Sequence, residues 1–404
     1  MIPMLLIVFL ILLLLGVPVA FSLGIPTILY FFLNIGTIPI EFMPHAMTNP
    51  LFNYVLIALP AFLLSGRMMN GTGVTNRIFN LARALVGRFR GGLIYTNIFA
   101  SMMFASMSGT AVGDAGGLGQ VEMEMMDRAG YKKDVAAGVT AASSVLGPII
   151  PPSVNMVILG ATASISIGKL FMGGIIPGLL MAAALMLNVT LRAHFTEEGR
   201  SWPVDKVPGK EVLNACLQGI LPMLCPVIII GGISLGVVTP TEAAILAIDY
   251  AILLGLLYRE ISFKSVWETL EATVASAGTF MYIIAVAGFY TWILTREGLP
   301  QMLTALLQPV VGYSQTVGLL VIAAFLLVVG CFLDTTAAIL MVALIIGIIT
   351  PPFGICLFVV SDVAKLPVSA VTKESLRYLP AMFITLLLLI FFPQLVTWLP
   401  GLLA

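Results

Sequence analysis

The sequence contains little charge. Only 9% of its 404 residues are charged, whereas a typical soluble domain contains roughly 25%. This scarcity excludes an ordinary soluble fold. Hydrophobic residues supply 60% of the chain, and apolar runs of about 20 residues, each long enough to cross a bilayer, recur along it. The composition therefore predicts an all-α, polytopic membrane protein embedded in a lipid bilayer.

Residues for metal, redox or catalytic chemistry are also scarce. The only histidines, His45 and His194, lie alone near segment ends, which argues against a histidine-ligated metal site. An intramembrane enzyme would need a motif such as HExxH, and none occurs. The cysteines lie singly in apolar surroundings without CxxC spacing, as expected of packing residues: Cys216, Cys225, Cys331 and Cys356. We predict neither an enzyme nor a nucleic-acid-binding protein, and no cofactor.

The basic residues are distributed unevenly, and this predicts the topology. All but Lys169 and Arg296 of the 19 basic residues fall in a few clusters. The positive-inside rule places those clusters in the cytoplasm. They comprise Arg67, Arg77, Arg83, Arg88, Arg90, Arg128, Lys132, Lys133, Arg192, Arg200, Lys206, Lys210, Arg259, Lys264, Lys365, Lys373 and Arg377.

The apolar segment 91–126 has cytoplasmic charge on both flanks. It must therefore enter the membrane and return on the same side. We predict a re-entrant helical hairpin whose turn lies near Ser108, Gly109 and Thr110. Irregular backbone at membrane depth is tolerated only where it is buried in protein or lines a water-filled cavity.

Two Pro-Pro pairs interrupt apolar segments, in residues 147–153 (GPIIPPS) and 347–354 (GIITPPFG). Proline lacks an N–H and clashes with the carbonyl one turn earlier, so each pair must break a helix. The freed carbonyls would cost several kcal/mol in hydrocarbon unless they line a cavity or bind something. Matched breaks in the two halves of a membrane protein point to a transporter binding site.

The two halves of the chain are repeats. Gly73 and Gly87 match Gly298 and Gly312 at an offset of 225, and Thr110 matches Thr335. The arm after Gly73 is basic and its counterpart is almost uncharged, so the repeats are inverted. Repeat 1 covers 1–195, with scaffold helices 1–72, an arm 73–90, and a hairpin and broken helix 91–193. A cytoplasmic linker, 196–211, leads to repeat 2 at 212–404, with scaffold 212–297, arm 298–312, and a broken helix and last helix in 313–404.

The second hairpin is too short for this repeat. Thr110 precedes Pro151 by 41 residues, but Thr335 precedes Pro351 by only 16. Sixteen residues cannot return from a hairpin tip and then re-enter the membrane as a helix. Either about 25 residues are missing between Thr336 and Ile346, which we favour, or the second hairpin is truncated.

Several motifs in order resemble one transporter family. They are residues 108–114 (SGTAVGD), 147–153, 236–243 (GVVTPTEA), 330–334 (GCFLD) and 350–354 (TPPFG). The chain resembles the large membrane subunit of the tripartite ATP-independent periplasmic (TRAP) transporters over essentially its whole length. The resemblance implies a bacterial or archaeal inner-membrane protein with an elevator-type scaffold and mobile transport domain. It also implies a small four-helix membrane partner, a periplasmic substrate-binding protein, and sodium-driven uptake of a small organic anion.

The hairpin tips and broken helices are the predicted binding sites. Carbonyls and half-helix C-termini suit Na⁺, and half-helix N-termini suit a carboxylate. By analogy with the family, one sodium site uses Ser106, Ser108, Gly109, Thr110, Ser144, Gly147 and Pro148. The second uses Asp334, Thr335, Thr336, Thr350, Pro351 and Gly354. The substrate is expected between them, against Ser108, Ser153, Asn155 and Thr335.

Carboxylates at membrane depth are functional candidates because they are costly to bury. Asp334, at the second tip, is the strongest. Asp114 could cap the hairpin or contact an ion, whereas Glu242 follows a helix-start sequence and should be a capping residue. Asp249 could face a partner subunit or pair within the scaffold, and Asp362 should pair with Lys365. No cluster of intramembrane basic residues is available for an anion, so sodium and helix dipoles are expected to neutralise it.

Two alternatives stay open. Small residues such as Ser, Gly and Thr also occur where membrane helices simply pack closely. A stand-alone elevator carrier, such as a sodium/dicarboxylate symporter without a binding protein, would share the hairpins and the proline breaks. Sialic acids, C4-dicarboxylates and other sugar or keto acids are all compatible with the sequence.

Overall fold

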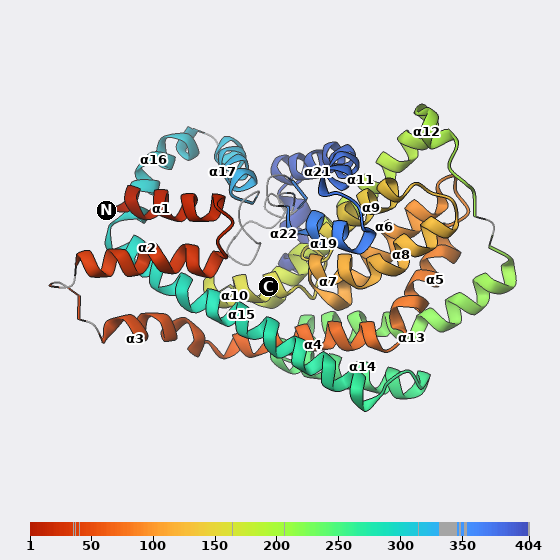
Figure 1. The fold of residues 1–404 in the computed structure, drawn as a ribbon, viewed down its shortest axis with the longest axis horizontal. Coiled ribbons are helices and arrows are strands. Elements are labelled where there is room, and N and C mark those ends of the chain that lie inside the picture. The colour runs from red at the N-terminus through yellow and green to blue at the C-terminus, as the bar shows by residue number, and fades with distance from the viewer. Residues whose placement is uncertain are drawn as a thin grey trace.

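The fold is helical throughout the part of the chain that the structure describes. This computed structural model describes residues 1–34, 36, 38–39, 41–163, 165–205, 207–313, 315–330, 346, 349–350 and 354–402. Within these ranges the extended pairing is limited to an isolated bridge between Arg90 and Val204. Figure 1 shows the helices arranged as an elongated body, with the middle of the chain along one long edge. The predicted all-α class is confirmed.

Within the described ranges, six helical segments are long and apolar enough to cross a membrane. They are Tyr54–Gly71, Ile167–Phe195, Gly209–Ser234, Pro240–Tyr258, Phe263–Arg296 and Val368–Phe391. Shorter apolar helices occur at Ile2–Leu14, Val19–Leu33 and Thr316–Phe325. These lengths confirm a polytopic membrane protein, because about 20 apolar residues span the hydrocarbon core.

Helices from both halves of the chain pack along one edge. The first half supplies α1 (Ile2–Leu14), α2 (Val19–Leu33), α3 (Phe42–Thr48), the 3₁₀ turns Asn49–Phe52 and Tyr54–Ile57, and α4 (Ala58–Gly71). The second half supplies α13 (Gly209–Ser234), α14 (Pro240–Tyr258) and α15 (Phe263–Arg296). Helix α4 packs on α14 and α15, and α15 also packs on α2 and α3 (Figure 1). Helices α4, α13, α14 and α15, which lie along one long edge of the body, are called the long-edge helices.

The first hairpin lies where the sequence predicts it. After α5 (Val74–Val86), α6 (Gly92–Ser108) runs to the tip, and α7 (Ala111–Gly116) and α8 (Leu118–Arg128) return beside it. Helix α5 packs on α6 and α13. Gly73 and Gly298, which precede the two matched arms, both adopt the left-handed conformation that glycine tolerates.

The first Pro-Pro pair breaks a helix, as predicted. Helix α9 (Lys133–Ser143) continues as a 3₁₀ turn, Ser144–Leu146, and helix resumes as α10 (Val154–Ala163). The intervening residues 147–153 form no helix. The chain then enters α11 (Ile167–Phe195) and the short α12 (Glu197–Arg200).

The second half is described only in part around its predicted tip. Helix α16 (Leu299–Tyr313) continues past Gly312, where the repeat predicts the arm to end. It is followed by α17 (Gln315–Gly330), α19 (Ile355–Ala364), α20 (Val368–Ser375), the 3₁₀ turn Leu376–Tyr378, α21 (Leu379–Phe391) and α22 (Gln394–Gly401). Helix α19 packs on α7 and α9, so the second broken segment lies against the first hairpin.

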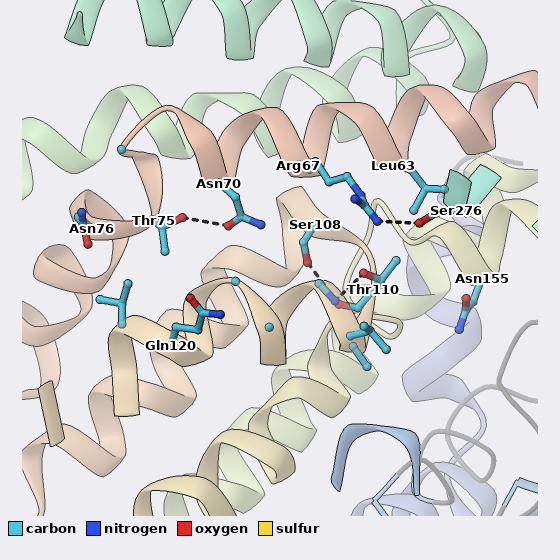
Figure 2. A pocket seen from close by; sticks show the side chains of 18 of the residues that line it. Leu63, Arg67, Asn70, Thr75, Asn76, Ser108, Thr110, Gln120, Asn155 and Ser276 are labelled. Carbon is cyan, nitrogen blue, oxygen red and sulfur yellow. Dashed lines mark hydrogen bonds between the residues drawn. The ribbon is translucent and has the colours of Figure 1, made fainter. Parts of the chain in front are cut away.

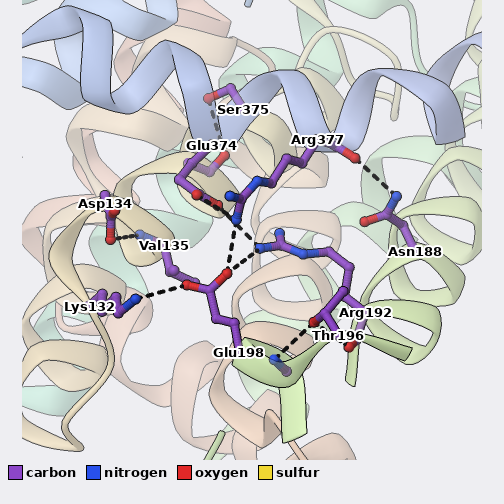
Figure 3. A network of polar contacts seen from close by, with 12 residues as sticks. Lys132, Asp134, Val135, Asn188, Arg192, Thr196, Glu198, Glu374, Ser375 and Arg377 are labelled. Atoms are coloured by element: carbon purple, nitrogen blue, oxygen red, sulfur yellow. Dashed lines mark hydrogen bonds and ion pairs between the residues drawn. The ribbon is translucent and has the colours of Figure 1, made fainter. Parts of the chain in front are cut away.

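An ion network joins the first broken helix to the second half (Figure 3). Glu198 on α12 lies 2.9 Å from Arg377, 3.4 Å from Lys132 and 3.5 Å from Arg192. Glu374 on α20 lies 2.6 Å from Arg377 and 3.2 Å from Arg192. Burial alone raises the pKa of Glu198, but hydrogen bonds from Arg377 and Lys132 outweigh it, and the net shift of that pKa is downward. The network fixes α9, α11, α12 and α20 to one another.

Candidate functional site

The hairpin tip is built by two adjacent residues with opposite local roles. Gly109 ends α6 in the left-handed conformation (φ +62°), and its N–H donates to the Ala105 carbonyl at 3.0 Å. Thr110 begins α7 as its N-cap, accepting a hydrogen bond at Oγ1 from the Gly113 N–H at 3.0 Å. A helix C-terminus and a helix N-terminus therefore meet at one point.

The tip contacts the broken helix directly. The N–H of Val154, the first residue of α10, donates to the Gly109 carbonyl at 3.2 Å. A Cβ on Gly109 would lie 2.6 Å from the Pro152 carbonyl oxygen, and one on Gly147 would lie 2.7 Å from the Thr110 carbonyl oxygen. Contacts this short exclude any side chain at the two glycines. The predicted pairing of tip and break is thus present in the structure.

A cavity of about 710 Å³ opens between this tip and the helices α4 and α15. Its walls come from α4, α5, the hairpin α6–α8, α10 and α15 (Figure 2). Many of the lining side chains are polar and uncharged. Among the described lining residues, Arg67 carries the charge. The polar lining residues are Arg67, Asn70, Thr75, Asn76, Ser108, Thr110, Gln120, Asn155 and Ser276.

Three predicted site residues line this cavity: Ser108, Thr110 and Asn155. The Ser108 hydroxyl points toward the Thr110 carbonyl, with 3.4 Å between the oxygens (Figure 2). Asn155 lies one residue beyond the start of α10 and shows its amide at the cavity edge (Figure 2). The structure thus brings the first tip and the first broken helix to one cavity.

Three other predicted hydroxyls lie elsewhere. Ser106 lines a separate, mainly apolar cavity of about 420 Å³ and donates to the Met103 carbonyl at 2.5 Å. Ser144 is fully buried and donates to the Ala141 carbonyl at 2.8 Å. Ser153 is also fully buried and donates to the Pro148 carbonyl at 2.8 Å inside the break. A hydroxyl that donates to a carbonyl keeps its own lone pairs free to accept.

The second predicted site is described at two residues. Thr350 donates from Oγ1 to the Ile346 carbonyl at 2.8 Å, and the buried Gly354 begins α19. Asp334, Thr335, Thr336 and Pro351 lie outside the described residues. Because α19 packs on α7, the described part of this second segment adjoins the first hairpin.

The candidate carboxylates have different surroundings. Asp114 is buried close to the Ser101 hydroxyl, and among the described residues no backbone N–H donates to its carboxylate, so it does not cap the hairpin backbone. Glu242 forms a capping box with Thr239, as predicted. Asp362 lies 3.0 Å from Lys365, also as predicted. Asp249 is exposed on the surface of α14.

The sequence analysis missed two charged residues near the tip. Glu122 on α8 is fully buried close to Ser101 and Asp114. Arg67 on α4, which the positive-inside rule groups with the cytoplasmic residues, lines the cavity. A signal was present for both, because each is an ionisable residue inside an apolar segment.

The geometry of a hairpin tip against a broken helix agrees with a comparison of sequences. A sequence model of the tripartite ATP-independent periplasmic transporter DctM component matches residues 6–347 and 340–395. The chain belongs to this TRAP transporter family. It is therefore a large permease subunit, a multi-pass inner-membrane transport protein rather than an enzyme.

Three large permease proteins of the family are similar to this chain over almost their whole length. The sialic acid TRAP transporter large permease protein SiaM of Vibrio cholerae is 39% identical over 413 residues, covering 96% of this chain and 95% of SiaM. The C4-dicarboxylate large permease protein DctM of the same species is 34% identical, with 96% and 95% covered. The 2,3-diketo-L-gulonate large permease protein YiaN of Escherichia coli is 33% identical, with 94% of each covered.

A solved transporter has the same fold. The YdaH transporter of Alcanivorax borkumensis superposes with a TM-score of 0.60 at 15% identity, covering 96% of this chain and 98% of that one. The alignment with SiaM extends over 413 positions, more than the 404 residues of this TRAP permease. Relatives thus contain positions without a counterpart here. That the shortfall lies between Thr336 and Ile346 stays a prediction.

Proposed function

We propose that this TRAP permease takes up a small organic anion together with Na⁺ by an elevator motion. The tip-bearing body, which comprises the hairpin α6–α8, the broken helix α9–α10 and α11, would move past the long-edge helices. The observation that carries this proposal is the contact of the hairpin tip with the broken helix beside a polar cavity. The cavity lies between the two groups of helices, where a moving body would carry its cargo. Discontinuous helices are how transporters expose carbonyls and helix ends at membrane depth.

Sodium would bind at the paired tip and break. Ser108, Gly109 and Thr110 meet Gly147 and Pro148 there, which concentrates carbonyl oxygens, the ligands that hard cations prefer. The hydroxyls of Ser106 and Ser144 donate to carbonyls and keep lone pairs available. We propose a second site at Asp334, Thr335, Thr336, Thr350, Pro351 and Gly354 by the repeat relationship.

Family membership supports two protein partners. We propose that a small membrane subunit of four helices and a periplasmic substrate-binding protein complete the transporter. Relatives are named for sialic acid, C4-dicarboxylate and 2,3-diketo-L-gulonate, all organic anions. We therefore propose an organic carboxylate as the substrate here, bound by Ser108, Asn155, Thr335 and the region of Ser153.

Uptake into proteoliposomes tests the coupling. We expect uptake by the reconstituted complex with its binding protein to disappear when external Na⁺ is replaced by choline, because the cation and the anion neutralise each other at the site. Full uptake driven by a proton gradient without Na⁺ would refute sodium coupling. Full uptake without any binding protein would instead support a stand-alone symporter.

A further inference from the structure

Arg67 is a cation that faces the cavity and has no carboxylate partner in the part of the chain that the structure describes. It lies on α4, is half-buried, and lines the cavity opposite the hairpin tip (Figure 2). Its Nη2 donates to the Ser276 hydroxyl on α15 at 2.7 Å. Among the described residues, no Asp or Glu lies within ion-pair distance of Arg67, and none lines the cavity. The other basic residue nearby in sequence, Arg77, is paired with Glu260 at 3.0 Å.

An unpaired guanidinium at the wall of a protein cavity favours an anion. The group carries five N–H donors in a planar fork that fits a carboxylate with two parallel hydrogen bonds. One hydrogen bond to a neutral hydroxyl leaves both the charge and most of these donors unused. Because the guanidinium is partly removed from water, it attracts an opposite charge more strongly there than at an exposed site.

The remaining polar groups around the cavity are neutral. Asn70 on α4, Asn76 on α5 and Gln120 on α8 offer amides, and Ser108 and Thr110 offer hydroxyls at the tip. Amides and hydroxyls can hydrogen-bond the hydroxyl groups of a ligand, but they carry no charge that would offset a second carboxylate. One cation among several neutral groups therefore matches an acid with one carboxylate and several hydroxyls.

We propose that Arg67 binds the substrate carboxylate and selects hydroxylated monocarboxylates over dicarboxylates. This inference rests on the proposed function, because it assigns a ligand class to the same cavity. Arg67 holds the anion on the long-edge side while the hairpin tip approaches from the other. Binding of the acid thus bridges the two groups of helices whose relative motion would carry it.

A purely structural role predicts a different pattern of effects. If Arg67 only ties α4 to α15 through Ser276, then removing either partner should have the same consequence. If Arg67 binds the carboxylate, its charge matters and the Ser276 hydroxyl does not. The variants Arg67→Gln, Arg67→Lys and Ser276→Ala separate the two roles.

Uptake kinetics give the first readout, with N-acetylneuraminate, D-gluconate and succinate as probes. For the monocarboxylate that the wild type transports best, we expect Arg67→Gln to raise KM at least tenfold. Loss of a charge-assisted pair of hydrogen bonds weakens binding by about this factor. Arg67→Lys should retain most of the affinity, and Ser276→Ala should resemble the wild type. An unchanged KM in Arg67→Gln, equal losses in Arg67→Gln and Ser276→Ala, or a wild type that prefers succinate would overturn the proposal.

Thermal stability of the detergent-purified protein gives a readout that does not need transport. We expect D-gluconate to raise the Tm of the wild type more than equal sorbitol does at matched ionic strength, and Arg67→Gln to abolish the difference. If no probe is transported but this protection holds, the anion site stands and the proposed uptake fails. If uptake occurs but Arg67→Gln changes neither readout, the uptake stands and the role of Arg67 is refuted. Neither transport nor protection in the wild type would overturn both.

Discussion

At the residue scale, glycine decides whether the hairpin tip can touch the broken helix. Gly109 needs a positive φ to end α6, and its missing Cβ also leaves room for the Pro152 carbonyl. Gly147 gives the same room to the Thr110 carbonyl from the opposite side. Two backbones can approach this closely only when neither carries a side chain at the contact.

Replacing Gly109 by alanine should therefore lower the free energy of unfolding by more than the backbone strain alone. A left-handed conformation costs an ordinary residue about 1–2 kcal/mol, and overpacking against backbone adds about 1–3 kcal/mol. Gly236→Ala is the matched control, because Gly236 has φ +69° and nothing within 4 Å of a Cβ. We expect Gly109→Ala to lower Tm clearly more than Gly236→Ala in differential scanning fluorimetry. Equal losses would show that tip and break are not in contact.

Several of these residues could be predicted from the sequence, and others could not. The hairpin turn and the first break follow from backbone chemistry, because glycine and proline restrict φ and hydrogen bonding wherever they occur. The place of Arg67 at the cavity could not be predicted, since a rule that counts charge by segment does not say which face of a helix a side chain occupies. Glu122 was overlooked because it shares α8 with Glu124, Asp127 and Arg128, and the sequence alone does not show that it is buried while they are exposed.

At the scale of elements, the ion network around Glu198 holds three helical segments that are distant in sequence. Lys132 precedes α9, Arg192 lies near the end of α11, and Glu374 lies on α20 (Figure 3). Close packing accompanies the charges, because a Cβ on Gly138 of α9 would lie 3.2 Å from the Glu374 Cα. The first broken helix is thereby fixed to the second half.

The lowered pKa of Glu198 predicts how stability depends on pH. The unfolded pKa of a glutamate is about 4.3, and the folded pKa of Glu198 is lower. Its charge therefore contributes fully to the free energy of unfolding above about pH 5.5, and this contribution is lost as the pH falls through the folded pKa. Glu198→Gln should lower stability at pH 7 by about 1–2 kcal/mol, between the values for exposed and buried ion pairs. Its penalty should shrink below about pH 4.

Glu124→Gln is the control for this measurement. Glu124 is exposed and pairs with Arg128 one turn away, so its removal should change stability by less than about 0.5 kcal/mol. Thermal unfolding of the three proteins between pH 3 and 8 gives the comparison. A pH-independent penalty for Glu198→Gln would mean that its charge does not stabilise the network.

At the scale of the whole molecule, the cavity lies between two groups of helices that also contact each other directly, and one of these contacts joins α4 to the hairpin tip. A Cβ on Gly66 of α4 would lie 2.9 Å from the Ser108 Cα and 3.1 Å from the Met107 carbonyl oxygen. An elevator motion must break this contact, whereas contacts within the tip-bearing body persist. The long-range arrangement could not be predicted beyond the repeat, because a match between halves does not specify which helices of one half pack on which of the other.

Cross-linking the two groups of helices is the most direct test of the proposed motion. In a chain without native cysteines, Gly168→Cys on α11 with Ile233→Cys on α13 should form a disulfide on oxidation, since a Cβ on Gly168 would lie 3.3 Å from the Ile233 Cγ2. The pair Gly178→Cys with Ile150→Cys, also in close contact, joins α11 to the break within one body and is the control. Sodium-driven uptake into proteoliposomes is measured before and after reduction. We expect oxidation to stop uptake by the first pair, reduction to restore it, and the control pair to transport in both states; full uptake by the cross-linked first pair would contradict the elevator motion.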